Sequence, residues 1–208
     1  MRSTLAVEVE AGSLVRVGAE LAVAGFFRDR RPLRGGAGLT DWRLCGWVSG
    51  LVGAARLRGE WGEAALLLTQ GRLLAPRVLL LGLGAEGHFD ADAHRNAVRL
   101  AVERAADLGA GVVALDLPPP RGVEAPERVA LGLLSGASEA LAPRAGRLLL
   151  RFVTAPGQAV PWRGAFEAAA ATLPRSATSI KLLRPAGAAA TPAGLRGARP
   201  GRAGTPPG

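Results

Sequence analysis

A glycine-rich segment follows an apolar run near the middle of the chain. The run at residues 78–81 leads into GLGAEG, residues 82–87, and a helical pattern comes next. A strand, the spacing G-x-G-x-x-G and a helix are together typical of a turn that holds the pyrophosphate of NAD or FAD. This is the first chemistry that the sequence suggests.

Other features of the same segment argue against a dinucleotide. The clear helical stripe begins several residues after Gly87, and Asp90 and Asp92 place negative charge where a phosphate would have to bind. Asp116, an acid near the end of the next strand, is farther away than the usual spacing of about 20 residues. We therefore expect Gly82 and Gly84 to let a strand end turn sharply against its neighbours, and we expect no cofactor.

Catalytic and metal-binding patterns are sparse elsewhere. Glu86, His88, Asp90 and Asp92 lie close together, but a solvated loop with a helix cap explains them better than a metal site. We expect His94 to be exposed. The helical serines Ser135 and Ser138 have no histidine near them in the sequence. The sequence thus predicts neither a catalytic nor a metal site.

The basic charge of the chain gives only weak support for nucleic-acid binding. The formal net charge is +9, yet every basic residue except Lys181 is arginine, and most of these arginines are scattered. One tight cluster lies in the loop at residues 28–34, so non-specific nucleic-acid binding stays a weaker alternative.

Cys45 is the only cysteine, which excludes an intrachain disulfide, and we expect it to be buried and inert. We expect the four tryptophans to pack in the core or on helix faces.

Hydrophobic periodicity indicates an α/β fold. Alternating or continuous apolar runs predict strands at residues 5–9, 13–17, 20–27, 63–69, 77–81, 111–117, 147–153 and 179–183. Residues 28–42 have the composition of a loop. Helical spacing predicts helices over residues 40–51, from a cap at Asp90 or Asp92 to residue 108, over 125–141, and from Pro161 to residue 173. The order predicts a three-layer α/β/α arrangement in which helices flank a mixed sheet whose centre is parallel.

The two ends of the chain complete the expected organisation. Residues 185–208 contain Pro, Gly, Ala and Arg without an apolar pattern, so we expect a domain over residues 1–184 and a disordered tail after it. The first 17 residues lack the continuous apolar core of a signal peptide, and no apolar stretch reaches about 18 residues. We therefore expect a cytoplasmic location and no membrane association.

A resemblance to a known family rests on several of these segments in order. The stretch RVLLLGLGAEGHFDADAHRNAVRLAVERAADLGAGVVALDLP, together with Gly62-Glu63 before a strand and Gly82-Leu83-Gly84 at the end of the next, resembles the N-terminal domain of the leucyl (cytosol) aminopeptidase family. The resemblance covers about residues 5–183. It implies a macro-domain-like fold, which agrees with the fold class expected from periodicity.

The resemblance also implies where the chemistry of the family lies. There a separate C-terminal domain holds two divalent metals through Asp, Glu and Lys side chains, and this sequence contains no Asn-Thr-Asp-Ala-Glu-Gly-Arg segment. We therefore expect a non-catalytic, stand-alone relative that acts as a binding or assembly module, through a protein partner or self-association. The alternative is a macro-type pocket for an ADP-ribose-like nucleotide, with Gly82, Leu83, Gly84, Gly87 and Asp116 as its ligand-binding residues.

Overall fold

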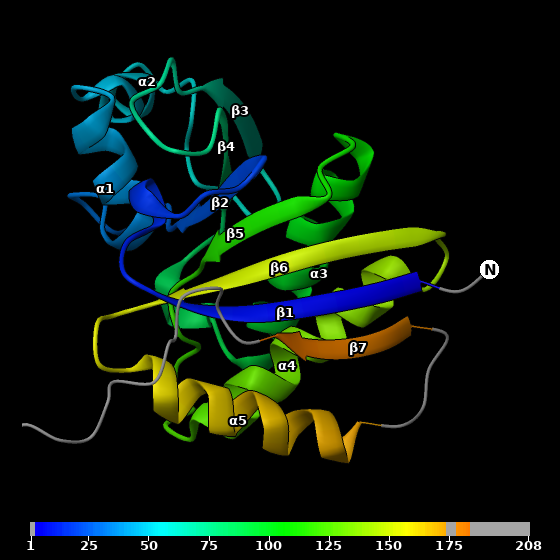
Figure 1. The fold of residues 1–208 in the computed structure, drawn as a ribbon. Coiled ribbons are helices and arrows are strands. Elements are labelled where there is room, and N and C mark those ends of the chain that lie inside the picture. The colour runs from blue at the N-terminus through cyan, green and yellow to red at the C-terminus, as the bar shows by residue number, and fades with distance from the viewer. Residues whose placement is uncertain (1–2, 174–177, 184–208) are drawn as a thin grey trace, which may run out of the picture.

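Seven strands form one mixed sheet in the computed structural model, which describes residues 3–173 and 178–183. The strand order is β3-β4-β2-β5-β6-β1-β7, and neighbours are parallel except for β3 and β4. The strands are β1 (Ser3–Ala11), β2 (Leu21–Phe26), β3 (Ala64–Leu68), β4 (Arg77–Gly82), β5 (Val112–Asp116), β6 (Gly146–Thr154) and β7 (Thr178–Leu183). The sheet is drawn in Figure 1.

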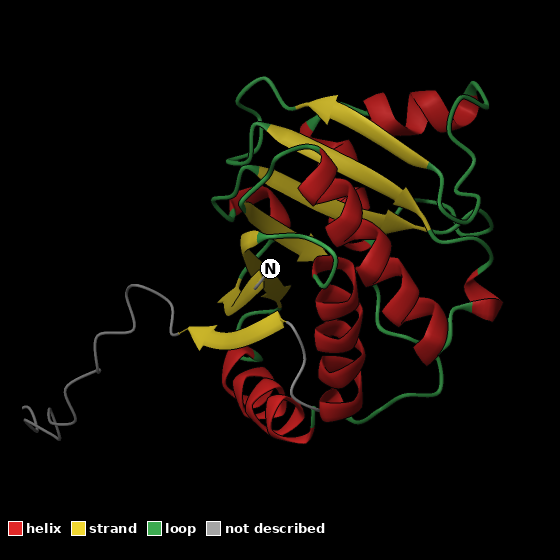
Figure 2. Cartoon of the chain, turned by 90° about the vertical axis from the view of Figure 1, so that its right-hand side faces the viewer, coloured by secondary structure: helices red, strands yellow, loops and turns green. Residues whose placement is uncertain are grey.

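Helices cover both faces of this sheet, as Figures 1 and 2 show. The helical elements are η1 (Leu14–Arg16), α1 (Gly35–Arg43), α2 (Trp47–Gly53), η2 (Glu86–His88), α3 (Ala91–Asp107), α4 (Pro126–Leu141) and α5 (Ala159–Thr172). Successive strand residues point to opposite faces, so each central strand contributes to two cores. On β2, Val23 packs in the core under α3, α4 and α5, whereas Ala24 packs in the core under α1 and α2. This confirms the three-layer α/β/α fold.

The long helix α3 forms where its sequence predicts it. The Asp90 side chain accepts a hydrogen bond from the Ala93 amide at 2.9 Å, which satisfies one of the free amides at the start of the helix. The stripe that includes Val98, Ala101 and Val102 is fully buried against the sheet. None of the helices in the described ranges is long and apolar enough to span a bilayer.

The structure corrects two predictions near the N-terminus. The strand expected at residues 13–17 is the single 3-10 turn η1. The helix expected over residues 40–51 is two helices, because Cys45 and Gly46 both adopt positive φ values, 57° and 80°, which break a right-handed helix. The first of the two, α1, begins at Gly35, inside the segment expected to be a loop.

Three predictions about burial are also wrong. The break between α1 and α2 leaves Cys45 exposed, with its sulfur 2.8 Å from a guanidinium nitrogen of Arg72. His94 is only 3% exposed, because α4 packs on the side of α3 that carries it. Three tryptophans lie largely on the surface, since α1, α2 and the loop before β3 turn these side chains outward: Trp42, Trp47 and Trp61. The predicted tail at residues 185–208 lies outside the described residues.

Close packing of α3 on α4 predicts opposite effects for two changes in α4. A Cβ atom at Gly136 would lie 2.3 Å from the carbonyl oxygen of Arg95, so Gly136→Ala must push the helices apart. At Gly132 the nearest atoms would be 3.9 Å away, and alanine favours a helix interior by about 1 kcal/mol over glycine. We expect Gly136→Ala to lower the free energy of unfolding by about 2 kcal/mol and Gly132→Ala to raise it. Urea denaturation measures both, and similar losses in the two variants would contradict this packing.

Candidate functional site

The turn at residues 82–84 has no free backbone amide for a ligand. The Gly82 amide donates to the Glu63 carbonyl at 2.7 Å, the Leu83 amide to the Phe26 carbonyl at 2.9 Å, and the Gly84 amide to the Gly59 carbonyl at 2.9 Å. A phosphate that bound here would have to displace these bonds. The turn is therefore built to join strand ends and not to hold an anion.

Close backbone approach explains why glycine occupies this turn. A Cβ atom at Gly82 would lie 2.1 Å from the Glu60 carbonyl oxygen, which no side chain permits. Gly84 has a φ of +72°, a conformation that favours glycine. Gly87, by contrast, has open space around it and no positive φ. The G-x-G-x-x-G spacing is thus a coincidence of two structural glycines with a third that is unconstrained.

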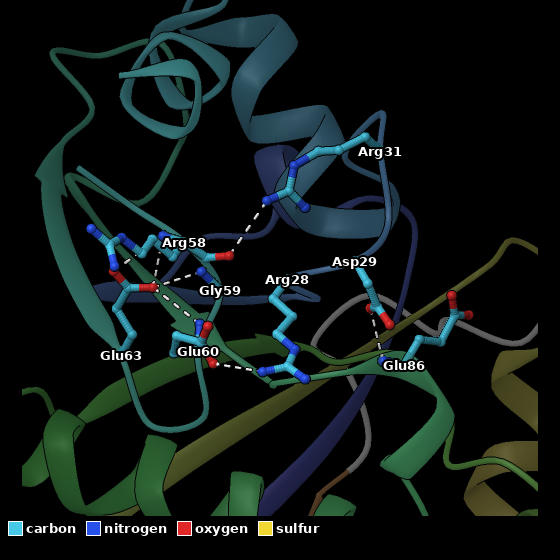
Figure 3. Close-up of polar contacts among 8 residues, drawn as sticks. All are labelled: Arg28, Asp29, Arg31, Arg58, Gly59, Glu60, Glu63 and Glu86. Atoms are coloured by element: carbon cyan, nitrogen blue, oxygen red, sulfur yellow. Dashed lines mark hydrogen bonds and ion pairs between the residues drawn. The ribbon is translucent and has the colours of Figure 1, made fainter. Parts of the chain in front are cut away.

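A hydrogen-bond network beside this turn connects the loop after β2, the loop before β3 and the segment that contains η2 (Figure 3). The Glu63 carboxylate accepts from three successive backbone amides, those of Arg58, Gly59 and Glu60, at 2.6 to 3.2 Å. The Arg28 guanidinium forms an ion pair with Glu60 at 3.2 Å. These contacts hold the loop after β2 against the loop before β3.

The same network extends to the segment that contains η2. The Asp29 carboxylate accepts from the Glu86 amide at 2.9 Å, and this bond lowers the pKa of Asp29. Arg30 forms an ion pair with Glu86, and Arg31 donates to the carbonyls of Phe27 and Arg58. Most of the arginine cluster that carried the weaker alternative of nucleic-acid binding is thus bound by the protein itself.

A pocket of about 260 Å³ lies at the carboxyl ends of β2 and β5. These strands are neighbours, but after β2 the chain continues to β3 on one side of the pair, and after β5 it continues to β6 on the other side. The crevice at such a divergence is the usual ligand site of open α/β sheets. The lining comes from β2 and the loop after it, from the start of α1, and from the end of β5: residues 25–27, 30, 33–36 and 116–119.

Asp116 is the acidic side chain in this lining, and it lies against the first turn of α1. A Cβ atom at Gly36 would come within 2.8 Å of its carboxylate oxygen, so only glycine permits this approach. Burial raises the pKa of Asp116 to about 6, and the hydrogen bond from the Gly36 amide offsets part of the increase. The carboxylate is therefore ionised at neutral pH only at a cost in stability.

The structure separates the residues that the sequence suggested for ligand binding. Asp116 lines the pocket, whereas Gly82, Leu83, Gly84 and Gly87 are not among its lining residues. Sequence reasoning missed Arg34 and the Gly35–Gly36 pair. A glycine pair after an arginine, shortly beyond the end of β2, was the available signal.

The acidic cluster after β4 is used structurally. Glu86 pairs with Arg30 and Asp90 caps α3. Within the described ranges, no three His, Cys, Asp or Glu side chains gather closely enough to hold a metal ion.

His94 is another ionisable group whose pKa is shifted, and unlike the half-buried Asp116 it is almost completely buried. It lines a separate pocket between α3 and α4, and its ring packs edge-on against Phe89 with centroids 5.9 Å apart. Burial lowers the pKa of His94 to about 4, so the imidazole is neutral near pH 7.

These two shifts predict opposing pH dependences of stability. Native Asp116 holds its proton more tightly than the unfolded chain does, so its contribution falls as pH rises from about 4 to about 6. Native His94 holds its proton less tightly, so its contribution grows as pH rises from about 4 to about 6.5. At 1.36 kcal/mol per pKa unit, each effect is on the order of 3 kcal/mol at most.

In the wild-type protein the two effects on the free energy of unfolding nearly cancel as pH changes. We therefore expect a variant that lacks one of the two groups to show the pH dependence caused by the other. Asp116→Asn should make stability rise with pH between 4.5 and 6.5, and His94→Phe should make it fall. Urea denaturation at four pH values measures this, with Glu124→Gln as the exposed control. Variant curves that run parallel to the wild-type curve would contradict the buried environment of both groups.

Comparisons with known proteins agree with this architecture. The profile of the cytosol aminopeptidase family, N-terminal domain, matches residues 23–142, more than half of the chain. A probable cytosol aminopeptidase of Alkaliphilus oremlandii is 27% identical over 132 residues, 63% of this chain and 26% of the relative. One of Alkalilimnicola ehrlichii is 34% identical over 102 residues, 49% of this chain and 20% of the relative. The chain thus spans between about a fifth and about a quarter of the length of these relatives.

Solved structures share the fold at low sequence identity. A tomato leucine aminopeptidase mutant superimposes with a TM-score of 0.55 at 17% identity over 81% of this chain and 37% of its own. The Oceanobacillus iheyensis macrodomain with ADP superimposes with a TM-score of 0.59 at 9% sequence identity, over 79% of this chain and 92% of the macrodomain. The Trypanosoma brucei macrodomain in complex with ADP-ribose superimposes with a TM-score of 0.54 at 16% sequence identity, over 77% of this chain and 67% of the macrodomain. The fold is therefore macrodomain-like, and by its sequence the chain belongs to the cytosol aminopeptidase family, of which it contains the N-terminal domain.

Proposed function

We propose that this domain is a binding module that acts without catalysis, and that its ligand site is the pocket at the ends of β2 and β5. The observation that favours this site is its position, where the connections from two neighbouring parallel strands diverge. The pocket combines apolar walls with a few charged groups, as small-molecule sites usually do.

An ADP-ribose-like nucleotide is the first ligand to test. The macrodomain neighbours include complexes with ADP and with ADP-ribose. Asp116 limits how such a ligand could lie here, because its carboxylate already faces the Gly36 amide and would repel a diphosphate. The hydroxyl groups of a ribose could instead donate to Asp116. About 260 Å³ is near the lower limit of ligand pockets, which suits a nucleoside portion better than a whole dinucleotide.

We expect ADP-ribose to perturb the backbone NMR signals of residues 25–36 and 116–119 and not those of α5. Leu33→Trp should fill the pocket and weaken binding at least tenfold by calorimetry. Leu74→Trp is the matched control, because Leu74 is 65% exposed and does not line this pocket. Perturbations that arise elsewhere, or equal binding by both variants, would contradict the site for this ligand. If no small molecule tested perturbs these residues, the proposed function itself fails.

Self-association is the second candidate function, and one region of the surface favours it. Of the eight most exposed large apolar side chains in the described ranges, seven lie within residues 39–74. The strand β3 is at an edge of the sheet and contains neither a charged residue nor proline, the usual protection of such edges. Leu66 and Leu68 are 41% and 63% exposed on one of its faces. A second copy could pair antiparallel with β3 and cover both.

We expect light scattering to show a dimer whose population grows with protein concentration. Leu66→Lys should place a charge in the paired edge and yield a monomer, whereas Val160→Lys, on the exposed surface of α5 and outside this region, should leave the dimer intact. A wild-type protein that is monomeric at all concentrations would exclude this role.

Two further expectations stay predictions. Nucleic-acid binding by the arginine loop has weaker support, because Arg28, Arg30 and Arg31 are already bound within the protein. A cytoplasmic location is consistent with the names of the cytosol aminopeptidase relatives.

A further inference from the structure

Three charged side chains line the pocket at the ends of β2 and β5: Arg30, Arg34 and Asp116. Arg30 is neutralised by its ion pair with Glu86. Within residues 3–173 and 178–183, Arg34 and Asp116 have no ion-pair partner within 4.0 Å, and this includes each other. The pocket therefore presents one positive and one negative charge that are apart and uncompensated.

The position of Asp116 decides which ligand charge it can meet. Its carboxylate lies at the first turn of α1, where the helix dipole would otherwise attract a ligand anion. The Gly36 amide already donates to it. A phosphate or carboxylate of a ligand is repelled from this end, whereas an ammonium group would compensate the half-buried negative charge of Asp116.

Arg34 supplies the opposite charge in the same lining. It is the residue before α1, its side chain is exposed, and no hydrogen bond or ion pair occupies its guanidinium in the described structure. A guanidinium binds carboxylates through two parallel hydrogen bonds. The lining of the same pocket also includes the apolar residues Phe27, Leu33 and Leu117.

We propose that this pocket selects a small zwitterion, in which a short hydrocarbon body separates an ammonium group bound by Asp116 from a carboxylate bound by Arg34. The inference rests on the proposed function, because it names the ligand class of the same pocket. The ligand is recognised by complementary charges at its two ends, and its body is desolvated by the apolar walls.

A series of zwitterions with increasing charge separation tests this selection. Glycine, β-alanine, γ-aminobutyrate and 6-aminohexanoate are titrated at pH 8 and followed by NMR on residues 25–36 and 116–119. We expect one length to bind best, at least tenfold more tightly than butylammonium, butyrate or inorganic phosphate. Binding should weaken as pH falls through about 6, because Asp116 then becomes protonated.

Two pairs of variants locate the charges. Asp116→Asn and Arg34→Gln should each weaken the best zwitterion at least tenfold, and only Arg34→Gln should leave the weak binding of butylammonium unchanged. The controls Glu124→Gln and Arg56→Gln remove exposed charges that do not line the pocket, and they should bind as the wild-type protein does. An unchanged thermal unfolding profile shows that each variant is folded.

The outcomes separate this inference from the function on which it rests. If ADP-ribose perturbs the pocket and no zwitterion does, the inference is overturned and the proposed function stands. If neither class perturbs these residues, both fail. Binding that is equal for butylammonium and every zwitterion would also overturn the inference, since it would assign no role to Arg34.

Discussion

Close contact between backbones at the carboxyl end of the sheet is the constraint on which this end of the molecule depends. Gly82 lies so near the Glu60 carbonyl that even a methyl group is excluded. The amides of residues 82–84 are paired with the end of β2 and with the loop before β3. Because these contacts fix both loops, the segment between β2 and α1 has a defined position, and it forms one wall of the pocket.

One carboxylate and the start of one helix bring opposite charges together at this end of the sheet. The helix α1 begins at the pocket, and its dipole would favour an anion there. Asp116 supplies that anion from within the protein. Its raised pKa shows that burial makes the charged form less stable than it would be in water. This macrodomain-like fold therefore places a carboxylate at the start of α1, and the proposed ligand carries a hydrogen-bond donor or a cationic group at this position.

Much of the fold could be predicted from the sequence because strand and helix periodicity reflect near neighbours. The stripe of α3, its Asp90 cap and the parallel centre of the sheet were predicted correctly. The single helix predicted over residues 40–51 was wrong, because the apolar spacing does not indicate that Cys45 and Gly46 adopt positive φ values. Of the residues suggested for ligand binding, only Asp116 lines the pocket.

The sequence by itself determined the order of the strands and α-helices from β3 onward, the family, and the structural reason for Gly82 and Gly84. Only the tertiary structure decided that His94 is buried, that Cys45 and three tryptophans are exposed, and that Arg34 and Asp116 face one cavity. The physical reason is distance along the chain. Local patterns record which side of an element is apolar, but burial and the meeting of charges depend on segments far apart in sequence.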